Sequence, residues 1–410
     1  MKQTAEIQSQ RIHQDIETIA GFSETDPAIG YGRPTFSPSW VRARDYVIEE
    51  AERTGCTTRI DAHGNVHIRQ RFCAWDTPVW LCGSHLDSVP SGGKFDGVTG
   101  VVCALELLRC GLDLELIIFA EEEGTTFGTA MLGSQSWVGS LSIDDLTRSR
   151  NSEGISYLEK GAAFGVRAES MATDRVRPEC YRGFLEVHPE QGLSLWKQDR
   201  AVAVVTRVNG RRHYEVCLSG QANHAGSTRM EDRRDALAGA AEAICEIEKL
   251  GALCAERKAY SVMTVGRIDV HPNAVNVIPG KTVFTIDFRA QSTEVLADGE
   301  QSLRAILNRI AARRNLELHI ENTEHLPPAD LSREVVQALH RAAALCDIDL
   351  PEIPSGALHD AAILAPYLPT AMLFVASKDG ISHHPAEFSR VEDITDAVRI
   401  LTRIIQNSRP

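Results

Sequence analysis

The chain has 410 residues, which exceeds the roughly 250–300 residues that one hydrophobic core usually holds, so we expect two domains. Its 43 Lys and Arg residues against 56 Asp and Glu residues give a net charge of −13, which argues against nucleic acid and anionic membranes as partners. The N-terminal segment lacks the apolar core of a secretory signal, and no apolar run approaches the ~20 residues that span a bilayer. We therefore expect a cytoplasmic protein.

Ten cysteines are spread over the chain without a C-x-x-C pair, and several lie in apolar runs such as VVCALELL. This pattern is typical of buried thiols in a reducing compartment. A disulfide framework is the alternative that the sequence leaves open.

Helical and strand-like periods alternate from about residue 10 to residue 110, which indicates βαβ units around a largely parallel sheet. The helical segments are RARDYVIEEAERTG and VTGVVCALELLRCG, and the strand-like segments are NVHIR, PVWLC and LELIIFA. The alternation resumes from about Arg333, notably with the buried strand TAMLFVAS. The predicted fold class is therefore α/β, with a mixed, mostly parallel sheet in the main domain.

The pattern changes between about residues 206 and 322, where the order is strand, helix, two strands and helix. That order predicts a small α+β domain, and the segments RVNG and ENTEHLPPADLS at its ends are typical of linkers. We predict that residues 207–324 form an inserted domain that divides the main domain into residues 1–206 and 325–410.

Polar clusters follow the predicted strands, and ligands bind at the carboxyl ends of strands in open α/β sheets. The segment GSHLDSVPSGGKFDGVTG carries His85, Asp87 and Asp96. It is either a metal site, in which one carboxylate orients the imidazole ring, or a polar loop that caps the next helix.

Three adjacent glutamates, Glu121, Glu122 and Glu123, follow a buried strand, where they repel one another unless a cation or shared proton compensates. A solvated turn is the alternative. Two histidines, His188 in FLEVHPEQG and His383 in GISHHPAE, also follow apolar strands, although a single histidine there is more often structural. Taken together, five side chains suit a pair of zinc-like divalent ions: His85, Asp96, Glu123, His188 and His383.

These motifs, in this order, resemble the amidase branch of the aminoacylase and carboxypeptidase G family of co-catalytic metal hydrolases. That branch holds N-carbamoyl-L-amino-acid hydrolases, β-ureidopropionases and allantoate amidohydrolases. The resemblance extends from GRPTFSP to the C-terminal helix. It implies two divalent ions per subunit, zinc or else manganese, cobalt or nickel. His85 and His188 would hold one ion, Glu123 and His383 would hold the other, and Asp96 would bridge the two.

The resemblance also implies roles for residues that are not metal ligands. Asp87 would orient His85, and Glu122 would be the general base. The inserted domain would be a lid and dimerisation domain of a homodimer, and its His224 would stabilise the oxyanion in the partner subunit's site. The small carboxylate substrate would contact Gln191, His224, Asn276, Arg289 and His359. For Arg289, an exposed charge at a strand end is the alternative that the residues alone favour.

The chain departs from the family pattern at Thr126, Pro189, Arg229 and Leu358. None of these residues is an implied metal ligand. The departures leave open which side chain the substrate carries. We expect hydrolysis of the carbamoyl or ureido C–N bond of a small carboxylate, above all an N-carbamoyl-L-amino acid. Allantoate is the alternative, because GRRHY resembles allantoate hydrolases more closely. Further alternatives are an aminoacylase or dipeptidase, and a binding protein on a degraded hydrolase scaffold, which the intact ligand set argues against.

Overall fold

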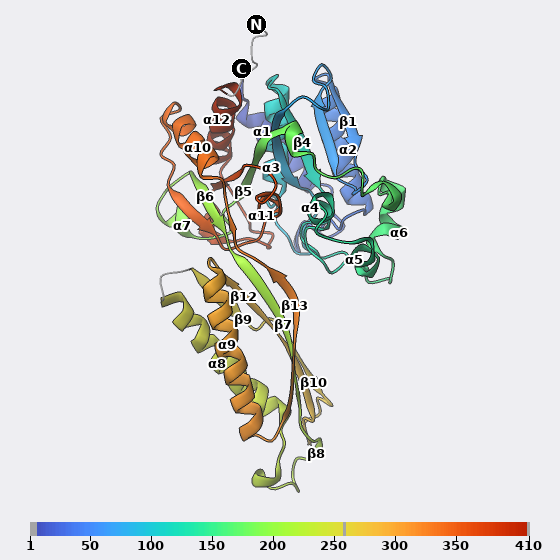
Figure 1. The fold of residues 1–410 in the computed structure, drawn as a ribbon, viewed down its shortest axis with the longest axis vertical. Helices are drawn as coiled ribbons and strands as arrows, with labels where there is room; N and C mark the ends of the chain where they lie inside the picture. Colours follow the sequence, from blue (N-terminus) through green and yellow to red (C-terminus); the bar gives the residue numbers. More distant parts are fainter. Residues whose placement is uncertain (1–5, 257–259, 408–410) are drawn as a thin grey trace. The chain divides into compact units, whose positions relative to one another are not determined.

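The structure is a computed structural model that describes residues 6–256 and 260–407, and it confirms the α/β class (Figure 1). The chain divides into two compact units. The larger unit holds the described residues up to Thr206, together with Asp330–Ile353 and the described residues from His359 onward. The smaller unit holds the described part of Arg207–Ala329 together with Pro354–Leu358. Among the helices of these described residues, none has the length and apolar character needed to cross a membrane.

A nine-stranded mixed sheet forms the centre of the larger unit. Its strand order is β1-β2-β4-β3-β5-β16-β6-β14, with β15 beside β6. The pairs β3/β4, β3/β5 and β5/β16 are parallel, whereas β1/β2, β2/β4 and β6/β16 are antiparallel. The strands are β1 Cys56–Ile60, β2 Val66–Gln70, β3 Val79–His85, β4 Leu114–Phe119, β5 Tyr181–Pro189, β6 Val202–Val208, β14 Ala329–Asp330, β15 Glu352–Ser355 and β16 Thr370–Val375. The carboxyl ends of β3, β4, β5 and β16 therefore lie along one edge of the sheet.

Helices cover both faces of this sheet, because side chains of a strand alternate between its two faces. In β4, Leu116 and Ile118 join a core that includes helices α1, α2, α3, α10 and α12. On the other face, the Phe119 ring packs against Trp137 of α4 and Phe184 of β5. The helices are α1 Ser9–Ala20, α2 Pro38–Glu52, α3 Val98–Arg109, α4 Leu132–Val138, α5 Ile143–Arg148, α6 Tyr157–Gly161, α7 Ser194–Lys197, α10 Arg333–Ala344, α11 Asp360–Leu364 and α12 Val391–Asn407.

Local sequence signals fix where several of these helices begin. Ser37 precedes α2, and its hydroxyl accepts a hydrogen bond from the Trp40 N–H while Pro38 occupies the first helical turn. In α5, Ser142 and Asp145 form a reciprocal capping box. These caps satisfy backbone donors that have no partner inside the helix.

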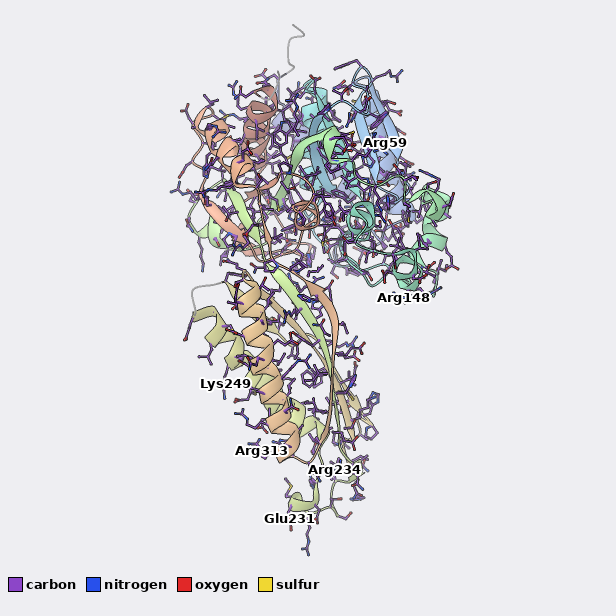
Figure 2. All side chains as sticks on the ribbon, viewed as in Figure 1. Arg59, Arg148, Glu231, Arg234, Lys249 and Arg313 are labelled. Atoms are coloured by element: carbon purple, nitrogen blue, oxygen red, sulfur yellow. The ribbon has the colours of Figure 1, made fainter. Side chains whose placement is uncertain are left out.

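The smaller unit is an antiparallel sheet with two long helices. Its strand order is β10-β12-β7-β13, with β9 beside β12, and a separate two-stranded ribbon pairs β8 with β11. Helices α8 (Ala236–Glu256) and α9 (Thr293–Arg313) lie side by side, and charged residues such as Lys249 and Arg313 stand on them (Figures 1 and 2). The strands are β7 Gly210–Ser219, β8 Asn223–His224, β9 Ser261–Thr264, β10 Ile268–His271, β11 Val277–Ile278, β12 Lys281–Ala290 and β13 Glu317–Leu326.

Two sequence-based expectations need correction. The segments RVNG and ENTEHLPPADLS lie at the chain boundaries of the two compact units, but RVNG lies mostly in β6 and β7, and ENTEHL lies in β13, so these connections are largely strand rather than loop. Among the ten free cysteines, Cys245 is exposed rather than buried.

A charged network is fully buried between β2, β4 and β5. His67 Nδ1 lies 2.6 Å from Glu115 Oε1 and His67 Nε2 lies 3.0 Å from Asp61 Oδ2, while Tyr181 donates to Glu115 and Arg69 forms an ion pair with it. Burial disfavours the charged ring, but hydrogen bonds to Asp61 and Glu115 raise the pKa of His67 above its ordinary value of 6.5. Although burial opposes the charged carboxyls, His67 lowers the pKa of both Asp61 and Glu115.

We predict that His67→Gln destabilises the metal-free protein by roughly 3–5 kcal/mol, the cost of breaking a buried charge pair. Because the folded pKa of His67 is raised, its contribution is complete below pH 6.5 and is lost as the pH rises through that folded pKa. Wild type and variant should therefore differ most at about pH 5.5–6.5 and less in alkaline buffer. Thermal unfolding across pH measures this difference, with the exposed His13→Gln as control. A difference that grows toward alkaline pH would contradict the prediction.

Candidate metal centre

The predicted ligands come from segments that meet at the carboxyl edge of the sheet. His85 is the last residue of β3, His188 lies at the end of β5, and Glu123 follows β4. Asp96 lies just before α3, and His383 follows β16. The parallel pairing of these strands brings residues almost 300 positions apart in the sequence to one site.

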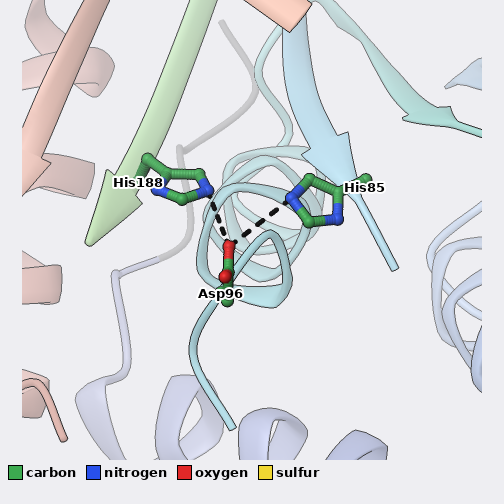
Figure 3. Close-up of side chains that lie close together, drawn as sticks. All are labelled: His85, Asp96 and His188. Carbon is green, nitrogen blue, oxygen red and sulfur yellow. Dashed lines mark ion pairs between the residues drawn. The ribbon is translucent and has the colours of Figure 1, made fainter. Parts of the chain in front are cut away.

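The first group consists of His85, Asp96 and His188, all of them buried. Asp96 Oδ1 lies 3.0 Å from His188 Nε2 and 3.6 Å from His85 Nε2 (Figure 3). The two imidazole rings, at the ends of neighbouring strands, are thus directed at one carboxylate oxygen. This arrangement can hold a single cation between two nitrogens and one oxygen.

Backbone carbonyls fix the tautomers of both histidines. His85 Nδ1 lies 2.9 Å from the carbonyl oxygen of Asp87, and His188 Nδ1 lies 3.0 Å from that of Pro189. A carbonyl only accepts hydrogen bonds, so each Nδ1 carries the hydrogen and each neutral ring offers an Nε2 lone pair toward Asp96. The site is thus arranged for metal ligation.

The second group consists of Asp96, Glu123 and His383. His383 Nε2 lies 3.1 Å from Asp96 Oδ2 and 3.7 Å from Glu123 Oε2. The two oxygens of Asp96 therefore face different groups, with Oδ1 toward the first and Oδ2 toward the second. The side chain of His383 is 51% exposed, so this group lies on the solvent side of the centre.

Asp87 connects the two groups through its backbone and its side chain. Its carbonyl orients His85, and its Oδ2 accepts a hydrogen bond of 3.0 Å from the Glu123 N–H. Its other oxygen, Oδ1, lies 3.7 Å from His85 Nδ1. The hydrogen bond to His85 is thus made by the carbonyl, while the carboxylate lies within ion-pair distance of His85 and holds the Glu123 backbone.

The glutamate turn is held against the start of α4. The N–H groups of Met131 and Leu132 donate to the carbonyls of Glu122 and Glu121, at 2.9 and 3.1 Å. Glu121 has a left-handed backbone with φ of 58°, and its Oε1 accepts from the Thr126 and Phe127 N–H groups. Glu121, which sequence reasoning left without a role, therefore shapes the loop. Thr126, one of the departures, also accepts from the Thr35 N–H through its hydroxyl.

Negative charge dominates this edge of the sheet. Burial, followed by Asp360, Asp96 and Asp87, raises the pKa of Glu122 well above its ordinary value, although His85 opposes the shift. Burial and Asp96 also raise the pKa of Glu123, whose Oε1 is buried without a hydrogen-bond partner.

Divalent cations would offset this repulsion, and the donor set of imidazole nitrogens and carboxylate oxygens is the one that zinc-like ions accept. The residues present therefore fit the implied metal ions. Glu122 Oε2 lies 3.7 Å from His85 Nε2 and belongs to neither ligand group, which leaves its carboxylate available for proton transfer.

Two predicted substrate residues lie beside the metal groups. Gln191 Nε2 donates to Asp96 Oδ2 at 2.9 Å, and the His359 ring packs against the His188 ring with centroids 4.4 Å apart. Sequence reasoning missed the buried carboxylates of Glu186 and Glu387. Glu186 could have been noticed as an acid inside the otherwise apolar strand FLEVH, whereas Glu387 gives no local signal.

The other predicted substrate residues belong to the smaller unit, and their roles stay predictions. His224 is exposed, and its Nδ1 accepts from the N–H groups of Gly226 and Ser227. Arg289 donates to Asp287 at 2.9 Å, and Asn276 is exposed. The departures Arg229 and Leu358 also lie in this unit.

A mixed α/β sheet with two histidine–carboxylate groups at its carboxyl edge is the architecture of a metal-dependent hydrolase. The chain belongs to peptidase family M20/M25/M40, which it matches over residues 81–407. It is 34% identical to an N-carbamoyl-L-amino acid amidohydrolase of Geobacillus stearothermophilus, over 96% of this chain and 97% of that protein. It is 33% identical to an allantoate amidohydrolase of Escherichia coli (strain K12), over 97% of each chain. A crystal structure of a hydantoinase/carbamoylase family amidase from Burkholderia multivorans has a TM-score of 0.85 and 33% identity, covering 98% of each chain.

The shared position of Asp96 predicts how metal binding responds to substitution. Asp96→Ala should weaken both groups, since it removes the only residue common to them, whereas His383→Ala should affect one group alone. Elemental analysis after dialysis against Zn²⁺ should give no tightly bound ion in the first variant and one in the second. The exposed Glu392→Ala is the control. Equal metal content in Asp96→Ala and His383→Ala would contradict the prediction.

Proposed function

We propose that this protein is a two-metal amidohydrolase that releases the carbamoyl group of a small carboxylate substrate, above all an N-carbamoyl-L-amino acid. The observation that carries the proposal is the Asp96 carboxylate, whose two oxygens face two separate ligand groups. The Geobacillus relative, named an N-carbamoyl-L-amino acid amidohydrolase, supports the substrate class.

In this proposal each subunit has places for two divalent ions, zinc or else manganese, cobalt or nickel. His85 and His188 would hold one, Glu123 and His383 would hold the other, and Asp96 would bridge them. Ions bound there supply Lewis-acid activation of water and of the substrate carbonyl.

Glu122 would be the general base. Its carboxylate is buried, and its Oε2 lies 3.7 Å from His85 Nε2 of the first ligand group, so it can take a proton from water and then transfer it to the leaving nitrogen. The products from an N-carbamoyl-amino acid and water would be the amino acid, carbon dioxide and ammonia.

The substrate carboxylate would be bound by Arg289 and Asn276. The Arg289 guanidinium suits this role because its planar fork matches a carboxylate, although it already contacts Asp287. Gln191 and His359, which contact the ligand residues Asp96 and His188, would line the substrate next to the metal ions.

His224 would donate to the oxyanion in the partner subunit of a homodimer. Its Nδ1 accepts two backbone N–H groups, so the neutral ring carries its hydrogen on Nε2. A preorganised donor of this kind stabilises the negative charge that develops on the substrate oxygen.

Allantoate is the second candidate substrate. The Escherichia coli relative is named an allantoate amidohydrolase. The segment GRRHY of this chain lies in β7, which pairs with β12, and Arg289 of β12 lies opposite Arg211 of this segment. Arg211 and His213 of this segment contact Glu324.

A substrate panel on metal-reconstituted protein tests the proposal. We expect turnover of N-carbamoyl-L-amino acids that chelation abolishes and that Zn²⁺, Mn²⁺ or Co²⁺ restores. The panel should also contain allantoate, N-carbamoyl-D-amino acids, N-carbamoyl-β-alanine, acetyl amino acids and dipeptides. Full turnover by protein free of metal, or turnover of dipeptides alone, would refute the proposal.

A conservative substitution tests the role of Glu122. Glu122→Gln keeps the size of the side chain and removes the base, so kcat should fall by roughly 10²–10⁴-fold with metal content retained.

Subunit mixing tests the role of His224. If His224 serves the neighbouring subunit, mixing Glu122→Gln with an inactive His224→Ala variant should restore about one quarter of wild-type activity. Half the dimers are then mixed, and each mixed dimer has one complete site of its two. No recovery after verified exchange would mean that His224 serves its own chain or serves only structure.

A further inference from the structure

Glu387 is a buried carboxylate residue outside both ligand groups, and the residue is only 3% exposed. Its Oε2 accepts hydrogen bonds from the backbone N–H groups of Phe95 and Asp96, at 2.8 and 3.1 Å. Its Oε1 accepts a hydrogen bond of 2.8 Å from the Ser382 hydroxyl. One side chain therefore binds the segment that carries Asp96 and the segment that carries His383.

A closed ring of hydrogen bonds runs from Glu387 back to Asp96. The Ser382 hydroxyl oxygen lies 3.1 Å from Gln191 Nε2, and the same Nε2 donates to Asp96 Oδ2 at 2.9 Å. The ring therefore holds Asp96 at both its backbone and its side chain. It includes segments that follow β3, β5 and β16, so three ligand-bearing loops share one network.

The loop before Asp96 closes tightly over the Glu387 side chain. A Cβ atom added at Gly93 would lie 2.1 Å from Glu387 Oε2 and 2.4 Å from its Cβ, closer than nonbonded atoms approach. Only glycine leaves room for this contact, so the loop is fitted to a carboxylate at this position.

Glu387 acts on the bridging residue through hydrogen bonds rather than through an ion pair. Within residues 6–256 and 260–407, no Lys or Arg forms an ion pair with it. A group that holds a metal ligand by hydrogen bonds orients that ligand and strengthens cation binding. Asp96 belongs to both groups, but Glu387 also holds Ser382 next to His383, so the effect falls most strongly on the second group.

We propose that Glu387 is a positioning residue that sets the affinity of the Asp96, Glu123 and His383 group for its metal ion. The inference rests on the proposed two-metal function. His85 and His188 are held by the carbonyls of Asp87 and Pro189, so the first group depends less on Glu387. His383 is half-exposed, has a left-handed φ of 52°, and follows Ser382 directly, so its position depends on this hydrogen-bonded segment.

Metal titration of the full chain tests the inference. Chelator-competition titrations with Zn²⁺, and separately with Mn²⁺, should give two binding events for wild type. In Glu387→Gln and Glu387→Ala the weaker event should lose affinity by roughly 10–100-fold, the usual effect of removing a group that orients a metal ligand, and the tighter event should lose much less. Ser382→Ala, which removes one hydrogen bond of the ring, should show the same selective effect to a smaller extent.

The exposed Glu392→Gln is the matched control, and it should bind both ions as wild type does. Melting temperatures of the metal-free proteins report any loss of folding, in which case Ser382→Ala carries the test. Unchanged affinities in the Glu387 variants, or equal losses in both events, would overturn the inference while leaving the two-metal proposal intact. A wild type that binds fewer than two ions would overturn both.

Discussion

Carboxylates buried beside histidines at one edge of the sheet are the constraint on which the rest of this protein depends. Burial raises the pKa of Glu122 and Glu123, whereas the facing histidines hold the pKa of Asp96 well below its ordinary value despite burial. Such a cluster is costly unless cations compensate. Hydrogen bonds hold the chain in place against this repulsion. They include those between the glutamate turn and the start of α4, and those of the ring through Glu387.

The two ligand groups differ in how firmly the fold holds them. The histidines of the first group stand on buried parallel strands, and their rings are oriented by the backbone. The second group depends on the turn that carries Glu123 and on the half-exposed His383. This difference predicts two unequal metal affinities within one site. The group that the fold holds less firmly is the one that lies toward solvent.

The sequence predicted the parts of this arrangement that depend on local pattern. Apolar strands followed by His85, Glu123, His188 and His383 indicated a shared edge, and the structure brings these residues together with Asp96. The pattern did not reveal which oxygen of Asp96 faces which group, and the division of the ligands into two groups was implied only by the family resemblance. Contacts such as that of Glu387 with Phe95 join residues 292 positions apart and have no local signal.

Pro189 is one of the positions where this chain departs from its relatives, and its carbonyl is the atom that orients His188. Every amino acid supplies such a carbonyl, and proline lacks only the N–H, which this contact does not use. Any residue after His188 can therefore supply the contact that fixes this tautomer. A substitution at position 189 leaves intact the arrangement that directs His188 Nε2 toward Asp96.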